Sequence, residues 1–410
     1  MLKLKRLTIH KFPRVKPGTE LVFNDGFNVL LGVNGSGKTT LLKLVCNILA
    51  GRFDVLRDGD LHVSYALEDG PNRCTVDARM SPRRPKTVAA RAPHVDVDVQ
   101  ISLPGHAPIS VRFIDDEAGI TYGEAAIERA KVSTRYAPPI SAALAQLEEA
   151  ETLDDATLAL IPGVLAVEPV RFDESTHWFE SQFASDGVSL HRLPSGEVYP
   201  FPSYVLPPAV GEALAAEIDA TELDEYRVDQ ERLPFLREAS NALGLKDASL
   251  YIGLMQREPD DTDGTRMYEF GNPRLYFTKT DGTRLLHEQL SFGQQRLLAF
   301  YFFAAIHSQI LVADELTNGM HHSMIASCID LIGNRQAFLA TQNPLLLDNL
   351  GFESADEVRR TFILCSTEQD NGREQMVWRN MTAQESENFY RDYKVGISHV
   401  NDILRSWGLW

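Results

Sequence analysis

A glycine-rich stretch, Gly32–Thr39, constrains the fold of this chain more than any other feature. Its letters GVNGSGKT fit the spacing GxxxxGK[ST], and they follow the apolar run Phe27–Leu31 and open an amphipathic helical segment that stops at Gly51. In such a strand, loop and helix order, backbone N–H groups at the helix N-terminus cradle phosphate oxygens, and glycines permit the close approach. The stretch therefore predicts a phosphate-binding loop (P-loop) in an α/β fold.

The same loop predicts a nucleotide and its metal ion. Lys38 is expected to reach the β and γ phosphates as a point charge, and the Thr39 hydroxyl to complete the coordination of Mg²⁺. We therefore expect ATP and Mg²⁺ as cofactors. The residues expected to contact the nucleotide in this loop are Gly32, Asn34, Gly35, Ser36, Gly37, Lys38, Thr39 and Thr40.

A second apolar run, Ile310–Ala313, ends in the two carboxylates of Asp314 and Glu315. Open α/β sheets place their chemistry at the carboxyl ends of the strands. Asp314 is expected to hold Mg²⁺, usually through water, and Glu315 to orient and deprotonate the water that attacks the γ-phosphate. The pattern predicts ATP hydrolysis.

The segment Leu290–Arg296, LSFGQQR, resembles the signature motif of ABC ATPases, and it lies just upstream of the Asp314 strand as it does in that class. In that family the signature serine and glycine contact the γ-phosphate held by the opposite subunit. The resemblance implies that Ser291, Gly293 and Gln294 complete the nucleotide site of a second copy. It therefore implies a homodimer or higher oligomer of ATP-sandwiched heads.

Within the ABC class, the opening segment LKRLTIHKFPRV and the following stretch Glu20–Leu42 resemble SMC, RecF and OLD-type ATPases more than transporter subunits. The stretch Asp314–His321, DELTNGMH, resembles the DE-x-x-NGLH stretch of OLD-type ATPases. The globular insertion without arms resembles the OLD-type ATPases of bacterial anti-phage systems, such as Septu and retron-associated ATPases. That resemblance implies a switch ATPase that regulates an effector encoded nearby, a nuclease or a toxin. Two alternatives stay open: a RecF-type DNA-repair ATPase acting directly on DNA, and an ABC transporter energy subunit.

The stretch Ala340–Asp348, ATQNPLLLD, resembles the switch strand of the same class, in which many relatives carry Thr-His-Ser. This chain has Gln342 where the switch histidine is expected. Glutamine can hydrogen-bond a γ-phosphate or the attacking water, but it cannot be protonated to carry charge. We therefore expect Gln342 to be a catalytic residue beside Lys38 and Glu315, and turnover to be slow.

Length and patterning predict the architecture. The 410 residues fit one α/β core with a large insertion. We expect residues 1–50 and 287–410 to form an ABC/SMC-head-like P-loop NTPase, and residues 51–286 to form an antiparallel β subdomain and a mixed, mainly helical insertion. No sustained apolar heptad occurs in this insertion, so we expect no coiled-coil arms.

Composition bounds the partners and the compartment. A net charge of −17 argues against a surface that binds nucleic acid throughout, because phosphate binding needs Lys and Arg. The stretch 70–94 is rich in arginine and proline, and we expect an irregular loop that either contacts nucleic acid or is merely solvated. No apolar segment is long enough to span a bilayer, and the four cysteines lie far apart. These features predict no membrane contact and reduced thiols in a cytoplasmic protein.

Overall fold

The computed structural model describes most of the chain, in two compact units. The described residues are 3–51, 59–81, 94–102, 104–105, 107–114, 117–122, 125–131, 171–172, 188–200, 206–218, 224–257, 265–306, 310–370, 372–396 and 399–408. The first unit comprises Met1–Arg171, Gln309–Glu315 and Asn334–Trp410, and the second comprises Phe172–Ser308 and Leu316–Gly333. The strands between residues 61 and 131 therefore belong to the same unit as the P-loop.

The first unit contains a six-stranded sheet in which four neighbouring strands run parallel to one another. β17 (Ile310–Asp314) pairs with β18 (Gln336–Ala340), and β18 pairs with β3 (Phe27–Leu31). Nearly all of their residues are buried, as expected of apolar strands covered on both faces. The sheet order is β10-β17-β18-β3-β19-β20. The outer strands are β10 (Arg171–Phe172), β19 (Phe362–Asp370) and β20 (Arg373–Asn380).

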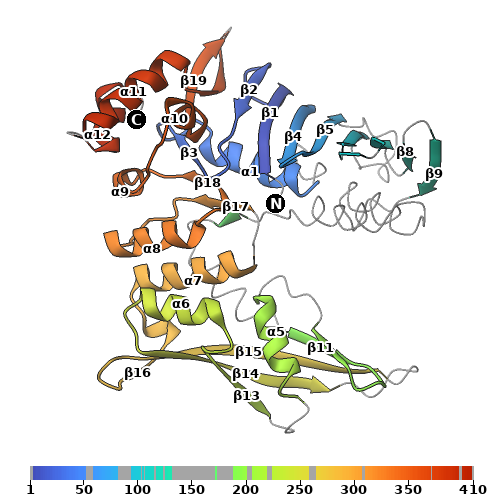
Figure 1. Ribbon diagram of the computed structural model, residues 1–410, viewed down its shortest axis with the longest axis vertical. Coiled ribbons are helices and arrows are strands. Elements are labelled where there is room, and N and C mark those ends of the chain that lie inside the picture. The colour runs from blue at the N-terminus through green and yellow to red at the C-terminus, as the bar shows by residue number, and fades with distance from the viewer. Residues whose placement is uncertain are drawn as a thin grey trace. The chain divides into compact units, whose positions relative to one another are not determined.

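An eight-stranded antiparallel sheet forms a second layer of this unit (Figure 1). Its order is β2-β1-β4-β5-β6-β7-β8-β9. Along β4 the residues Leu61, Val63 and Tyr65 are buried, whereas the intervening His62 and Ser64 are only half-buried, so the strand has an inner and an outer face. The strands are β1 (Lys3–Lys11), β2 (Thr19–Val22), β4 (Leu61–Asp69), β5 (Asn72–Ser81), β6 (His94–Ser102), β7 (Ile109–Ile114), β8 (Glu117–Tyr122) and β9 (Ala125–Lys131).

Helix α1 (Lys38–Leu49) packs against both sheets of the first unit. Its apolar side chains, Leu41 and Val45 among them, share one hydrophobic core with buried residues of both sheets. Tyr65 of β4 donates a hydrogen bond to the carbonyl oxygen of Ile48 at 2.8 Å. These contacts hold α1 in place and thereby fix the loop that precedes it.

The arginine-rich stretch 70–94 differs from the irregular loop that was predicted. Residues Asn72–Ser81 form β5, which pairs with β4 and β6, and the exposed Arg73 and Arg79 alternate there with buried apolar residues. The prediction was wrong for these residues because it weighed their charge and overlooked the period of two that marks an amphipathic strand. Residues 82–93, the rest of the predicted loop, lie outside the described residues.

The second unit contains an antiparallel sheet in the order β12-β11-β15-β14-β13, with β16 paired to β15. Helix α6 packs on β14, and α6, α7 and α8 lie side by side (Figure 1). Between residues 51 and 286 an antiparallel β subdomain and a mixed, mainly helical insertion were predicted. The antiparallel strands are present, and the described residues of the insertion hold more strands than helices. The elements of the second unit are β11 (Val188–Arg192), β12 (Val198–Pro200), β13 (Glu225–Asp229), β14 (Asp247–Arg257), β15 (Arg266–Thr278), β16 (Arg284–Leu286), α5 (Pro208–Ala215), α6 (Pro234–Ala242), η2 (His287–Gln289), α7 (Phe292–Ile306) and α8 (His322–Ile332).

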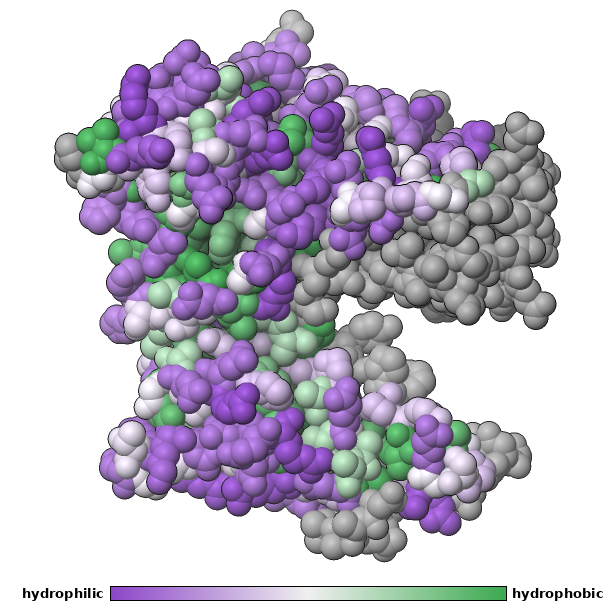
Figure 2. Space-filling model, viewed as in Figure 1, coloured by the Kyte–Doolittle hydropathy of each residue, from purple (hydrophilic) through white to green (hydrophobic). Residues whose placement is uncertain are grey.

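The predicted α/β class and the absence of coiled-coil arms are confirmed for the part of the chain that the structure describes, in which α7 is the longest helix at 15 residues. None of the described helices is both long and apolar enough to cross a membrane. The C-terminal part adds α9 (Pro344–Asp348), α10 (Ala355–Thr361), α11 (Ala383–Val395) and α12 (Val400–Ser406). The outward surface of α10 and α11 is mostly hydrophilic (Figure 2).

Candidate functional site

The P-loop lies against β20. Gly37, the N-cap of α1, has a φ of 86°, and a Cβ at this position would lie 2.2 Å from the Met376 sulfur. Only glycine combines that backbone conformation with so close a contact. Trp378, which is 2% exposed, donates from Nε1 to the carbonyl oxygen of Ser36 at 3.2 Å. β20 therefore fixes the loop backbone from one side.

The loop holds donors suited to phosphate oxygens. Lys38 is buried, and its Nζ donates to the carbonyl oxygens of Gly32 and Val33 at 2.7 and 3.2 Å. The buried hydroxyl of Ser36 has no hydrogen-bond partner among the described residues, although buried polar groups are normally paired. This donor set fits a phosphate group. In the loop, Ser36 and Lys38 are buried, Gly32, Gly37 and Thr40 are half-buried, and Asn34, Gly35 and Thr39 are exposed.

Asp314, at the carboxyl end of β17, lies against the first turn of α1. Its Oδ2 accepts one hydrogen bond from Thr39 Oγ1 and one from Arg171 Nη1, each at 2.7 Å. The Asp314 side chain is 10% exposed and that of Arg171 is 20% exposed. A hydroxyl and a carboxylate side by side are the oxygen ligands that Mg²⁺ takes. Thr39 and Asp314, the two predicted metal ligands, thus lie together, and the Arg171 guanidinium donates to the same carboxylate oxygen of Asp314.

Glu315 and Gln342 lie beside this pair. Glu315 has a φ of 50° and donates from its backbone N–H to the Ala340 carbonyl oxygen at 2.8 Å. Non-glycine residues rarely adopt such a φ, and strained residues cluster at functional sites. The backbone N–H of Gln342 donates to Glu315 Oε2 at 3.2 Å, and its Nε2 donates to Asn34 Oδ1 at 2.5 Å. Gln342 therefore links the P-loop to the predicted base.

The signature residues belong to the second unit. Ser291 and Gln294 form reciprocal hydrogen bonds between side chain and backbone at the start of α7, at 3.4 and 2.9 Å, which is a capping box. A Cβ on Gly293 would lie 2.3 Å from the carbonyl oxygen of Gly319, so α7 approaches the segment after Glu315 closely. Ser291 is exposed at the helix N-terminus.

Arg296, the last residue of the signature segment, anchors α7 within the second unit. It is 1% exposed, and its Nε donates to the Leu316 carbonyl oxygen at 2.9 Å. Its guanidinium lies 5.1 Å from the ring centroid of Phe172. Since a buried guanidinium must be paired to be tolerated, these contacts fix the signature helix against the backbone that follows the two carboxylates.

Three residues around the candidate site were not predicted from the sequence: Arg171, Met376 and Trp378. Arg171 follows the mostly apolar stretch Gly163–Val170, GVLAVEPV. Such a pattern is typical of a short strand and could have predicted that Arg171 lies at the edge of a sheet. For Met376 and Trp378 the sequence holds no comparable signal. Their role depends on the contact between β20 and the P-loop, and Trp378 and Ser36 are 342 residues apart in the sequence.

The four cysteines are buried and form no disulfide. Burial raises the pKa of Cys46, Cys74 and Cys365 to about 12, and it raises the pKa of Cys328 still further. They are therefore protonated at neutral pH. The structure has them as free thiols, the form predicted from their spacing in the sequence.

A comparison with protein families adds an independent observation on the N-terminal region. Residues 6–79 match the AAA domain. The matched stretch contains the P-loop, α1 and the strands β2, β3 and β4. The match therefore covers the P-loop with the helix and strands around it, and it ends well before Asp314 and the signature segment.

Similar solved structures are SMC head domains. The head domain from Thermotoga maritima is 11% identical, with a TM-score of 0.42, over 92% of this chain and 98% of that chain. An SMC head bound to the C-winged helix domain of ScpA is 13% identical, with a TM-score of 0.42, over 93% and 98%. The Pyrococcus furiosus head with an extended coiled coil is 12% identical, with a TM-score of 0.38, over 96% and 100%. No curated protein matches the sequence.

Proposed function

We propose that this chain is a Mg²⁺-dependent ATPase of the ABC/SMC type. The proposal rests on one convergence: the P-loop, the Thr39–Asp314 pair and the Glu315–Gln342 pair meet at the carboxyl edge of three parallel strands. Phosphoryl transfer needs such a phosphate cradle, metal ligands and a water-positioning group. The test is phosphate release from ATP by the purified chain with Mg²⁺ and with EDTA. A chain that neither binds nor cleaves ATP would rule the proposal out.

Each residue of the site has a distinct role. Lys38 turns from the loop carbonyls to the β and γ phosphates, whose charge it offsets. Thr39 and Asp314 would hold Mg²⁺, and the ion would neutralise the charge that develops on the phosphate. Glu315, oriented by the backbone N–H of Gln342, accepts the proton of the attacking water.

In this proposal two copies close head to tail around two ATP molecules. Ser291 is exposed at the N-terminus of α7, where backbone N–H groups and the helix dipole favour an anion. Phe292 beside it is 51% exposed, a large apolar side chain suited to an interface. The γ-phosphate bound by one copy would therefore contact Ser291, Gly293 and Gln294 of the other.

The proposed biological role is a switch in bacterial anti-phage defence, in which closure on ATP and reopening regulate a nuclease or toxin encoded nearby. Its support is the resemblance of Asp314–His321 to OLD-type ATPases, together with the net charge of −17, which disfavours the RecF-type alternative acting directly on DNA. Co-purification from the native host identifies the partner. Recovery of repair proteins with tight binding to duplex DNA would favour the alternative instead.

Replacing Arg171 with Gln is expected to lower the Mg²⁺ concentration that half-saturates ATP binding by about tenfold. The guanidinium and Mg²⁺ compete for the Asp314 carboxylate, and a hydrogen bond to a charged group contributes on the order of 1.5 kcal/mol, about a factor of ten. A fluorescent ATP analogue titrated with Mg²⁺ measures the shift. Arg112→Gln, which removes a more exposed ion pair with Asp96 outside the site, is the control for the loss of an arginine. An unchanged or higher Mg²⁺ requirement in Arg171→Gln would contradict the competition.

Replacing Gln342 with Ala is expected to lower kcat by about 100-fold, the usual cost of losing one preorganised donor, with little change in the Kd for ATP. Gln342→His is expected to raise kcat above that of the wild type, because an imidazole can carry charge where the amide cannot. Steady-state phosphate release measures both variants. If both variants hydrolyse ATP at the wild-type rate, Gln342 is not a catalytic residue.

A further inference from the structure

A cluster of two histidines and a carboxylate lies on the antiparallel sheet, outside the nucleotide site. His10 is on β1, His62 on β4 and Asp77 on β5, three strands that neighbour one another in that order. All three side chains lie on the outer face, where His10 is exposed and the other two are half-buried. Nothing in the proposed ATP chemistry uses them.

The backbone brings the three groups together through a local irregularity. In the β1–β4 register Ile9 pairs with Val63 and Lys11 with His62, so His10 sits in a bulge without a partner of its own. A bulge re-aims a side chain, and bulges are over-represented next to functional sites. As a result the His10 and His62 rings stack with their centroids 4.2 Å apart and an interplanar angle of 29°.

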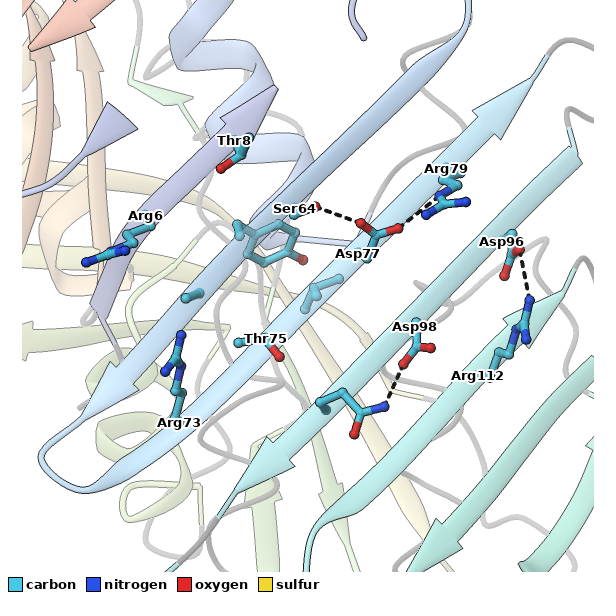
Figure 3. Close-up of a pocket in the computed structure, with 14 residues that line it drawn as sticks. Arg6, Thr8, Ser64, Arg73, Thr75, Asp77, Arg79, Asp96, Asp98 and Arg112 are labelled. Atoms are coloured by element: carbon cyan, nitrogen blue, oxygen red, sulfur yellow. Dashed lines mark hydrogen bonds and ion pairs between the residues drawn. The ribbon is translucent and has the colours of Figure 1, made fainter. Parts of the chain in front are cut away.

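The ligand-type atoms of the cluster are close and already oriented. One atom from each of His10, His62 and Asp77 lies within 4.8 Å of the others. Asp77 Oδ2 is 3.1 Å from His62 Nε2 and accepts from Ser64 Oγ at 2.7 Å, while His10 Nε2 is 2.9 Å from the same Ser64 oxygen. Figure 3 shows the Ser64–Asp77 contact on neighbouring strands. Ser64 thus holds the carboxylate and one imidazole in place.

We propose that His10, His62 and Asp77 bind a divalent transition metal ion of the Zn²⁺ class. Imidazole nitrogens with one carboxylate oxygen are a ligand set that Zn²⁺ accepts, and three protein ligands leave a fourth position for water. Ligand atoms around a tetrahedral Zn²⁺ lie about 3.4 Å apart, so small side-chain rotations close the present spacing around an ion. Ser64 supplies the outer hydrogen bonds that such ligands require.

The charge state of the carboxylate suits this role. Burial raises the pKa of Asp77, but hydrogen bonds from Ser64 and His62 and the charge of Arg79 outweigh it, so that its pKa lies below the usual value. Ser64 and Asp77 also line a depression of about 540 Å³ on the same sheet face, together with Arg79, Asp96, Asp98 and Arg112 (Figure 3). Water can therefore reach the fourth position.

The test is calorimetric titration of the full chain with ZnCl₂, without nucleotide. We expect one site per chain, weakened at least tenfold in Kd by His62→Ala and by Asp77→Asn, because even changes to outer hydrogen bonds weaken metal sites about 10- to 100-fold. His399→Ala, an exposed histidine before α12, should bind like the wild type. Cys46 and Cys74, the thiols of the same region, are buried and protonated and do not compete.

His10→Ala provides a second variant, since its side chain is exposed and its loss should leave the sheet intact. Far-ultraviolet circular dichroism of each variant without metal checks folding. In addition, Zn²⁺ should raise the Tm of the wild type and not of the folded variants, because an ion that binds only the native state stabilises it. The proposal is overturned if the wild type binds no Zn²⁺, or if folded variants at His10, His62 and Asp77 bind it as the wild type does.

Discussion

Glu315→Gln is expected to lower the rate constant for ATP hydrolysis by about 10²- to 10⁴-fold, the range that a positioned general base contributes. The amide keeps the shape of the side chain and the contact with the Gln342 backbone, but it cannot accept a proton from water. ATP affinity should stay within about threefold, since the phosphate cradle is untouched. Single-turnover phosphate release and equilibrium binding of a fluorescent ATP analogue measure the two effects separately.

The matched control is Glu374→Gln, an exposed glutamate on β20 whose loss should leave hydrolysis unchanged. Backbone strain at Glu315, with its φ of 50°, is the same in the glutamine variant, so a difference in rate reports the chemistry of the side chain. Hydrolysis at the wild-type rate in Glu315→Gln would show that another group activates the water.

Lys38→Ala is expected to weaken ATP binding by roughly 100-fold, since removing one partner of a buried charge pair costs about 3 kcal/mol. The Lys38 ammonium is buried within the loop and donates hydrogen bonds to two carbonyl oxygens. An alanine side chain has no group that replaces this donor. Isothermal titration with Mg²⁺ and a non-hydrolysable ATP analogue measures the loss.

Lys43→Ala changes an exposed lysine of the same helix and is the control for Lys38. It should bind the nucleotide as the wild type does, and thermal unfolding of both variants separates lost binding from lost fold. Wild-type affinity in a folded Lys38→Ala chain would mean that the nucleotide binds elsewhere.

The sequence predicted the central sheet and the places of the P-loop and the two carboxylates along it, because each of these is encoded locally. The run Phe27–Leu31, the glycine loop and the helix after it are contiguous, and Asp314 and Glu315 end an apolar strand. Their meeting follows from parallel pairing, which brings the carboxyl ends of β3, β17 and β18 to one edge. Thr39 and Asp314, 275 residues apart, were therefore predictable partners.

Other features depend on pairings that no local pattern encodes. Arg171 reaches Asp314 because a two-residue strand adds to the edge of the sheet, and Trp378 supports the P-loop because β20 lies beside β19. The His10–His62 stack depends on a bulge in the β1–β4 register, which shifts one side chain relative to the alternation. A strand pattern predicts a face, but not which residues become neighbours across strands.

We propose that two copies of the chain complete each other's nucleotide sites. The most direct measurement is the molar mass of Glu315→Gln by size-exclusion chromatography with light scattering, with and without ATP and Mg²⁺. We predict the mass of one chain without ATP, twice that mass with ATP, and the mass of one chain under both conditions once Ser291→Arg is added. A single-chain mass in the presence of saturating ATP, or an ATP-dependent dimer that survives Ser291→Arg, would contradict head-to-tail closure around ATP.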